Sequence, residues 1–205
     1  EGAENPVAEA EISARRALGV VAEPPPVLGR SGHTATLLAT GELIVAGGTS
    51  GGVPTERVEI YDPVSKRWRE VAKMNSARAG HTATLLGNGK LIVIGGYGAA
   101  GPLKTVELFD PSSGKWTVLP ELSHARSGHT ATLLHAGKLL VVGGYSALGG
   151  TLPAQIEMLD LELGRWSMPS SLPALSGRHG HTATILQNGN VLIAGGQGVN
   201  GSAMV

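Results

Sequence analysis

The stretch Arg30-Ser-Gly-His-Thr-Ala-Thr-Leu-Leu, residues 30–38, occurs four times in the chain with few changes. The other copies begin at Arg78, Arg126 and Arg178. Each copy leads into a second apolar stretch that ends in two glycines, and these pairs are Gly47-Gly48, Gly95-Gly96, Gly143-Gly144 and Gly195-Gly196. The pairs follow one another at intervals of 48, 48 and 52 residues. A recurrence of this length is typical of architectures in which each repeat packs against the next.

Each repeat has the pattern of four short strands. Within the first motif, Thr34, Thr36 and Leu38 alternate with Ala35 and Leu37, which is the period of two that a strand requires. Three of the copies continue through a third stretch, Val58-Glu-Ile-Tyr-Asp-Pro, Val106-Glu-Leu-Phe-Asp-Pro or Ile156-Glu-Met-Leu-Asp-Leu, and then reach a tryptophan, at Trp68, Trp116 and Trp166. Four strands in about 50 residues, separated by glycines, predict one blade of a β-propeller.

The double glycine, the aromatic residue that follows it in two copies and the later tryptophan resemble the repeat of the kelch family. The resemblance covers roughly residues 30 to 205. The repeat is similar to that of the bacterial branch of the family, which is related to the propeller of galactose oxidase. It implies an all-β, kelch-type β-propeller of about four blade-equivalents, each with four antiparallel strands. The blades are expected to start near residues 30, 78, 126 and 178.

The last blade is predicted to be incomplete in this chain. Asp-Pro comes 14 residues after Gly48 and 14 after Gly96, and the same step from Gly196 passes the last residue. Residues 1–29 form an N-terminal segment in which Glu11-Ile12 precedes Arg30 at the distance by which Glu59-Ile60 precedes Arg78. Either residues 10–29 are a worn copy of the outer strands that closes a four-blade ring, or the chain is a fragment or part of a larger propeller. Pro24 to Pro26 and the lack of a tryptophan count against the closed ring.

The repeated polar residues are interpreted as structural. Residues that recur once per blade are spread around the axis, whereas metal ligands must converge on one point, so no metal site is expected at His33, His81, His129 and His181. The arginines before each first strand are expected to bond backbone carbonyls or carboxylates of the next blade, and these are Arg30, Arg78, Arg126 and Arg178. The glycine pairs are expected at positive φ or at close contacts between blades. The tryptophan strands lie among charges and are assigned to the rim.

Composition excludes several classes of function. Lys plus Arg and Asp plus Glu are 16 each, so there is no basic excess for nucleic acid. The longest apolar runs are far shorter than the about 20 residues of a membrane span. Galactose oxidase-like enzymes use copper with a tyrosine cross-linked to a cysteine, and this chain has no cysteine. Nothing in the sequence points to catalysis, and no cofactor is expected.

The loops after the glycine pairs break the repeat, and variable loops on a rigid scaffold are where recognition usually occurs. They supply the candidate binding residues Tyr97, Lys104, Tyr145, Gln197 and Asn200. The predicted function is a non-catalytic binding or scaffold module with a protein partner, exposed outside the cell or at its surface. Two alternatives stay open: an accessory domain of a larger enzyme, and a structural subunit whose open blade is completed by another chain.

Overall fold

The computed structural model describes residues 24–146, 156–169 and 177–198. In these ranges the chain consists of short antiparallel strands and a single helical turn, the 3-10 turn η1 (His135–Gly137). Three sheets have four strands each, and we call each of them a blade. A two-stranded sheet follows them, and we call it the fourth blade. The all-β propeller and the incomplete fourth blade predicted from the repeat are thereby confirmed for the described residues.

The strands of each blade run outward from the axis in chain order, each paired antiparallel with the one before it. Blade 1 consists of β1 (Thr34–Leu37), β2 (Leu43–Ala46), β5 (Val58–Asp62) and β6 (Arg67–Glu70). Blade 2 consists of β7 (Thr82–Leu85), β8 (Leu91–Ile94), β11 (Val106–Asp110) and β12 (Lys115–Leu119). Blade 3 consists of β13 (Thr130–Leu134), β14 (Lys138–Val142), β15 (Ile156–Asp160) and β16 (Arg165–Ser167). The fourth blade has β17 (Thr182–Ile185) and β18 (Val191–Ala194).

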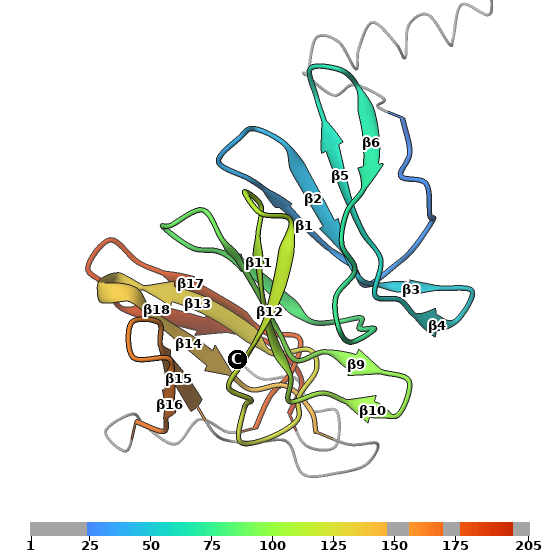
Figure 1. The fold of residues 1–205 in the computed structure, drawn as a ribbon. Helices are drawn as coiled ribbons and strands as arrows, with labels where there is room; N and C mark the ends of the chain where they lie inside the picture. Colours follow the sequence, from blue (N-terminus) through green and yellow to red (C-terminus); the bar gives the residue numbers. More distant parts are fainter. Residues whose placement is uncertain (1–23, 147–155, 170–176, 199–205) are drawn as a thin grey trace, which may run out of the picture.

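Two small hairpins extend from one end of the blades, in the loops after the glycine pairs. They are β3 (Thr49–Ser50) with β4 (Val53–Pro54), and β9 (Tyr97–Gly98) with β10 (Gly101–Pro102). We call this the loop end, and we call the opposite end, with the β1–β2 and β7–β8 turns, the turn end (Figure 1).

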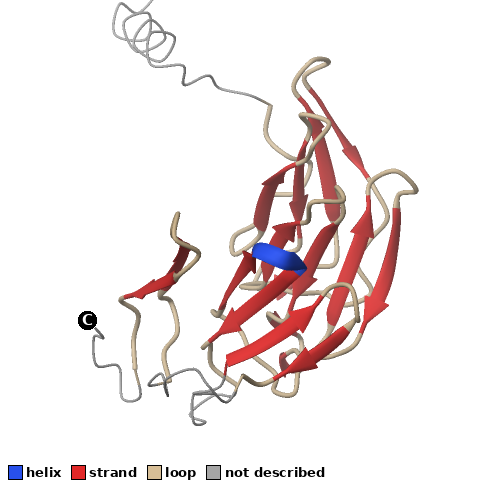
Figure 2. Cartoon of the chain, turned by 90° about the vertical axis from the view of Figure 1, so that its left-hand side faces the viewer, coloured by secondary structure: helices blue, strands red, loops and turns tan. Residues whose placement is uncertain are grey.

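The blades stand side by side along an arc. The innermost strands contact each other in order, β1 with β7, β7 with β13 and β13 with β17. In the described part of the chain, no comparable contact joins β17 back to β1. Figure 2 shows the two-stranded fourth blade, which leads to the C-terminal label, at one end of the row. The sheets therefore form an open arc and not a closed ring.

The apolar core lies between the blades. All four residues of β8 are fully buried, and adjacent residues of a strand point to opposite faces, so blade 2 must be covered on both sides. Leu91 and Val93 pack into a cluster shared with blade 1. Ile92 and Ile94 pack into a second cluster, shared with blade 3. The buried area is thus supplied by the contact of neighbouring repeats, as in other repeat architectures.

The N-terminal segment is described only from Pro24 onward. Residues 24–29 form no strand and run along the rim of blade 1, where the Trp68 indole donates a 2.7 Å hydrogen bond to the Pro24 carbonyl. The carbonyls of Ala72 and Pro120 accept the corresponding bonds from the next two tryptophans. Residues 24–29 therefore occupy the place of a connection between blades. The strand pair predicted nearer the N-terminus, around Glu11-Ile12, lies outside the described residues.

Candidate functional site

The histidine of each motif bonds the threonine of the blade before it. His81 Nε2 lies 2.9 Å from Thr34 Oγ1, and His129 and His181 repeat this contact with Thr82 and Thr130 at 3.0 and 2.9 Å. The three imidazoles are buried. His33 begins the row and is exposed, with no threonine bonded to it in the described part of the chain. These histidines tie successive blades together instead of converging on one point.

A backbone bond between glycines accompanies each histidine contact. The Gly80 amide donates to the Gly32 carbonyl at 2.9 Å, Gly128 donates to Gly80 at 3.2 Å, and Gly180 donates to Gly128 at 3.0 Å. All three bonds run in the same direction, from each blade to the one before it. Together with the glycine-pair contact described below, the His–Thr bond and this glycine bond form what we call the blade joint.

The arginine of each motif is buried against a glutamate. Arg78 Nη2 lies 2.5 Å from Glu107, and its Nη1 donates to the Gly95 and Thr105 carbonyls at 2.8 and 3.1 Å. Arg30 pairs with Glu59 and Arg126 with Glu157 in the same way. Burial lowers the pKa of Arg78, and the Glu107 carboxylate opposes that shift. The expected carboxylate partner thus exists, but it belongs to the arginine's own blade and not to the next one.

The glutamate also holds the connection that enters its blade. Glu107 accepts hydrogen bonds from the backbone amides of Asn75 and Ser76 at 2.6 and 3.0 Å. Glu157 accepts one from Ser123 at 2.7 Å. Sequence reasoning missed these buried carboxylates. The available signal was a glutamate recurring at one position of an apolar strand, as in Val58-Glu-Ile and Val106-Glu-Leu.

The first glycine of each pair faces the next blade. A Cβ on Gly47 would lie 2.4 Å from the Arg78 carbonyl oxygen and 2.8 Å from His81 Cε1. Gly95 and Gly143 have equivalent contacts, and all three have positive φ. The second glycine donates its amide to the same carbonyl, as Gly48 does to Arg78 at 2.8 Å. A side chain is therefore excluded on steric and conformational grounds.

The tryptophans lie half-buried on the outermost strands. Trp68 and Trp116 pack against Tyr61 and Phe109 with tilted rings, at centroid distances of 5.1 and 4.9 Å. Trp116 packs against the cluster between blades 1 and 2, and Trp166 against the cluster between blades 2 and 3. Their indole groups are bonded to connections at the rim, so they lie at the edge of the core.

The joint histidines make the fold sensitive to acid. Burial, followed by the nearby arginine charge, lowers the pKa of His81 and of His129 to about 3. The unfolded chain takes up these protons near the ordinary pKa of about 6.5. Between these values the unfolded state binds more protons, so the free energy of unfolding falls as pH falls from about 6.5.

We expect urea midpoints to fall steadily from pH 7 to pH 4.5 in the unchanged protein. His129→Asn should reduce this slope, because one of the groups that link stability to pH is gone. His124→Gln, at an exposed side chain, should leave the slope unchanged. A urea midpoint that does not vary between pH 7 and pH 4.5 would contradict the link between the buried histidines and stability.

The predicted recognition residues that the structure describes lie at the loop end. Tyr97, Tyr145 and Gln197 occupy equivalent positions, and each pairs its backbone with the residue after a motif arginine. Tyr97 and Tyr145 are half-buried and make no ring contact with each other, whereas Tyr145 meets His179 edge-on at 5.6 Å. Lys104 is exposed, and its carbonyl accepts a bond from Leu122. Asn200 lies outside the described residues. The hairpin tips carry small residues, Gly51-Gly52 and Ala99-Ala100.

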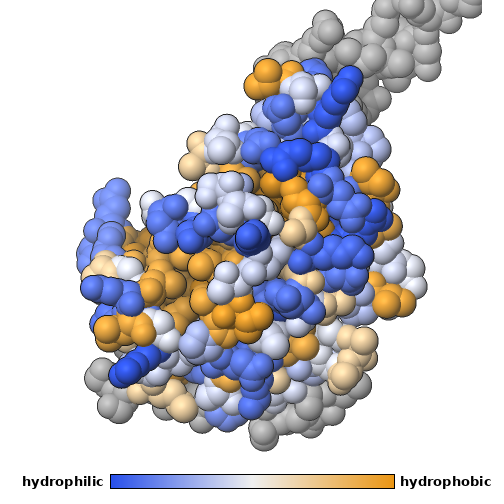
Figure 3. All heavy atoms as spheres, in the orientation of Figure 1, coloured by the Kyte–Doolittle hydropathy of each residue, from blue (hydrophilic) through white to orange (hydrophobic). Residues whose placement is uncertain are grey.

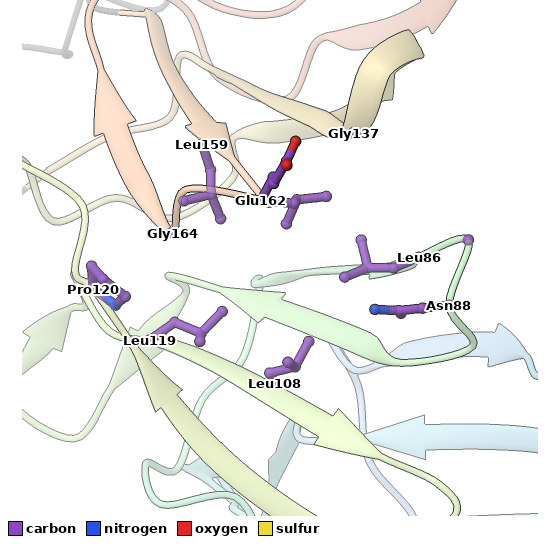
Figure 4. A pocket seen from close by; sticks show the side chains of 11 residues that line it. Leu86, Asn88, Leu108, Leu119, Pro120, Gly137, Leu159, Glu162 and Gly164 are labelled. Atoms are coloured by element: carbon purple, nitrogen blue, oxygen red, sulfur yellow. The ribbon is translucent and has the colours of Figure 1, made fainter.

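An apolar pocket of about 370 Å³ opens between blades 2 and 3, toward the turn end. Its walls are leucines from both blades, and its edge carries Asn88 and Glu162; the leucines are Leu86, Leu108, Leu119, Leu159 and Leu161. Figure 4 shows the leucines of blade 2 across the gap from Leu159. Figure 3 shows apolar side chains gathered in a hollow beside β11–β12 and β13–β15. Leu161 stands where the first two blades have the proline of Asp-Pro.

Two kinds of feature are absent from the described ranges. In residues 24–146, 156–169 and 177–198, no three His, Asp or Glu side chains gather so that they could hold a metal ion. No helix in these ranges is long and apolar enough to cross a membrane.

Comparison with known proteins agrees with the repeat. The family model of the KLHDC2/KLHL20/DRC7 Kelch-repeats domain matches residues 32–204. Among solved structures, "Structure of YjhT" is similar, with a TM-score of 0.67 and 23% sequence identity. The match covers 82% of this chain and 59% of that one, and at this identity it shows the fold alone. No curated protein matched the sequence significantly. Since the family model spans most of the chain, the chain belongs to the family of kelch-repeat propellers.

Proposed function

We propose that this chain is a non-catalytic protein-interaction module that takes an apolar side chain of its partner into the pocket between blades 2 and 3. Kelch-repeat domains are generally protein-interaction modules. The observation that carries the proposal is the pocket itself, an open leucine-lined hollow within the size range of ligand sites. We also propose, from the sequence resemblance alone, that this module is exposed outside the cell or at its surface.

The chemistry of the repeat supports binding over catalysis. The motif arginines of the first three blades bond glutamates and carbonyls, and the histidines of blades 2 to 4 bond threonines. These groups therefore hold the blades together. The aspartates of the outer turns cap their own backbone, as Asp62 does by accepting the Val64 amide at 2.8 Å.

The composition of the pocket defines the partner. Its leucine walls suit one aliphatic or aromatic side chain, which is the kind of anchor that usually dominates an interface. The exposed carboxylate of Glu162 at its edge favours a lysine or arginine next to that anchor. A peptide segment with an apolar residue beside a basic one fits both features.

The test uses peptides selected from a random library for binding to the unchanged protein. Gly87 lines the pocket, its φ lies outside the positive region, and no atom lies within 4 Å of where its Cβ would be. Gly87→Phe should therefore fill the pocket without disturbing the fold, and it should weaken binding about tenfold or more, or 1.4 kcal/mol. Gly29→Phe is the matched control, because Gly29 has the same freedom and does not line the pocket.

The charge at the edge is tested separately. Glu162→Lys should weaken binding of peptides with a basic residue, whereas Glu121→Lys, at another exposed acid, should not. If Gly87→Phe left the affinity of the selected peptides unchanged, the pocket would not be their binding site. If Lys104→Ala weakened their binding instead, the recognition surface would be the loop end.

A further inference from the structure

A second hollow opens at the turn end, between blades 1 and 2, with a volume of about 290 Å³. It occupies the same place in the repeat as the pocket between blades 2 and 3. Ala39 of the β1–β2 turn lines it where Gly87 of the β7–β8 turn lines the other pocket. Gly89 of the following blade likewise takes the place of Gly137. Two successive interfaces between blades therefore leave a hollow at the same end.

The two hollows adjoin at the β7–β8 turn. Asn88 in this turn lines both of them. Leu86, before it, lines only the pocket between blades 2 and 3, and Lys90, after it, lines only the hollow between blades 1 and 2. Figure 4 shows the Asn88 side chain beside that of Leu86. One partner segment that crosses this turn can therefore reach both hollows.

The hollow between blades 1 and 2 carries charged groups, and we call it the polar pocket. Glu42, Lys90 and Asp110 line it. Lys90 pairs with Asp110 at 3.0 Å, and Glu42 pairs with Arg69 at 2.9 Å. Both carboxylates thus already have a cation beside them. The polar pocket therefore suits a different side chain from the one that enters the leucine-lined pocket.

The polar pocket contains hydrogen-bond donors that its own residues leave unused. The Asn88 Oδ1 accepts the Lys90 amide at 3.1 Å, whereas the Nδ2 group of Asn88 bonds to no described residue. The Lys90 ammonium has three N–H groups, and among the described side chains it contacts only Asp110. Asp110 also accepts a bond from the Ser112 hydroxyl. The chemistry of the pocket thus calls for an acceptor from outside the chain.

We propose that the polar pocket binds the side-chain carboxamide of an asparagine or glutamine of the partner. This residue lies on the same segment as the apolar anchor, so the inference rests on the proposed function. The carboxamide oxygen accepts from Asn88 and Lys90. Its nitrogen donates to Glu42, whose two oxygens each accept one bond, from Thr40 and from Arg69, and keep a further lone pair.

Other polar groups fit the polar pocket less well. A carboxylate would lie beside the carboxylates of Glu42 and Asp110, which line the pocket with only one cation, Lys90, between them. An ammonium or guanidinium group would bring only donors to a pocket whose unused groups are already donors. A carboxamide supplies an acceptor and donors together, and it carries no charge.

The distance between neighbouring blades sets the spacing of the two residues in the partner. Sheets that pack face to face lie about 10 Å apart, and an extended segment rises about 3.3 Å per residue. The carboxamide residue should therefore lie about three or four residues from the apolar anchor. Such a segment places one side chain in each of two successive interfaces between blades.

Peptides selected from a random library for binding to the unchanged protein test the proposal. They should share an asparagine or glutamine at one fixed spacing from an aliphatic or aromatic residue, and selected peptides without it would overturn the proposal. Asn88→Asp keeps the Oδ1 acceptor of the turn but removes the donor, so it should weaken their binding about tenfold or more. Asn188→Asp is the matched control, because Asn188 Oδ1 accepts the Asn190 amide at 3.0 Å in the equivalent turn and Asn188 lines neither pocket.

The partner's side of the contact is tested with the same variant. A peptide whose asparagine or glutamine is replaced by alanine should bind the unchanged chain about tenfold more weakly, and Asn88→Asp should weaken it no further. This coupling assigns the loss to the carboxamide, which is needed because Asn88 lines both pockets. Equal losses for the original and the alanine peptide on Asn88→Asp would contradict the assignment.

Filling the polar pocket separates this inference from the proposed function. Ala39→Phe places a ring in the polar pocket, as Gly87→Phe does in the other, and it should also weaken binding about tenfold or more. Gln187→Phe is the control, at an exposed residue of the β17–β18 turn that lines neither pocket. Circular dichroism confirms that the variants fold. If Gly87→Phe weakens binding and Ala39→Phe does not, the polar pocket is wrong and the proposed function stands. If neither weakens binding, both fail.

Discussion

Glu107→Ala is expected to lower the free energy of unfolding by about 3 to 5 kcal/mol, because it leaves the Arg78 guanidinium buried without its anion. Both side chains are almost fully buried. The change also removes the acceptor of the Asn75 and Ser76 amides, which fixes the connection between blades 1 and 2. Urea unfolding followed by tryptophan fluorescence would measure the loss.

An exposed ion pair in the same fold is the control. Arg57 and Glu70 pair at 2.7 Å with both side chains about a third or more exposed. The hydrogen bond from Arg57 lowers the pKa of Glu70. Solvent screens an exposed pair of this kind, so it contributes little to stability. Glu70→Ala should therefore cost only a small part of the loss that Glu107→Ala causes. Equal losses for the two variants would show that the buried pair does not anchor the blade.

Gly47→Ala is the second change expected to have a large effect, with a loss of roughly 2 to 5 kcal/mol. An alanine at φ of +62° costs about 1 to 2 kcal/mol in backbone strain alone. Its Cβ would also lie 2.4 Å from the Arg78 carbonyl, so blades 1 and 2 must move apart, and overpacking typically adds about 1 to 3 kcal/mol.

Gly195→Ala separates these two contributions. It occupies the same repeat position at φ of +68°, and a Cβ there would meet nothing within 4 Å. Gly195→Ala should therefore lose only the stability that corresponds to the backbone strain. If both alanine variants were equally destabilised, the close approach between blades would not explain the glycine pairs.

The repeat predicted the fold because its marks are local and recur. The motif, the glycine pair and the tryptophan place three strands of each blade, and the missing Asp-Pro after Gly196 indicated the short fourth blade. The partner of each arginine was harder to predict. Arg78 and Glu107 lie 29 residues apart, and only the antiparallel order β7–β8–β11 brings their strands into one blade.

The pocket could not be predicted from the repeat alone, since one of its lining residues departs from the repeat. Leu161 replaces the proline found after Asp62 and Asp110. The walls of the pocket come from strands of two blades, and the separation of these two blades depends on how their outer strands pack. The candidate loop residues that the structure describes lie at one end of the blades, and whether they recognise a partner stays a prediction.

The one-way bonds between Gly80 and Gly32, Gly128 and Gly80, and Gly180 and Gly128 have an evolutionary consequence. The same glycine of a blade donates its amide to the blade before and accepts with its carbonyl from the blade after. A gene duplication that copies one 48-residue unit therefore inserts a blade with both of its contacts already matched, and the deletion of one unit rejoins its neighbours without a mismatch. Blade number can then change during descent by whole units, while an insertion of any other length is tolerated only in the loops.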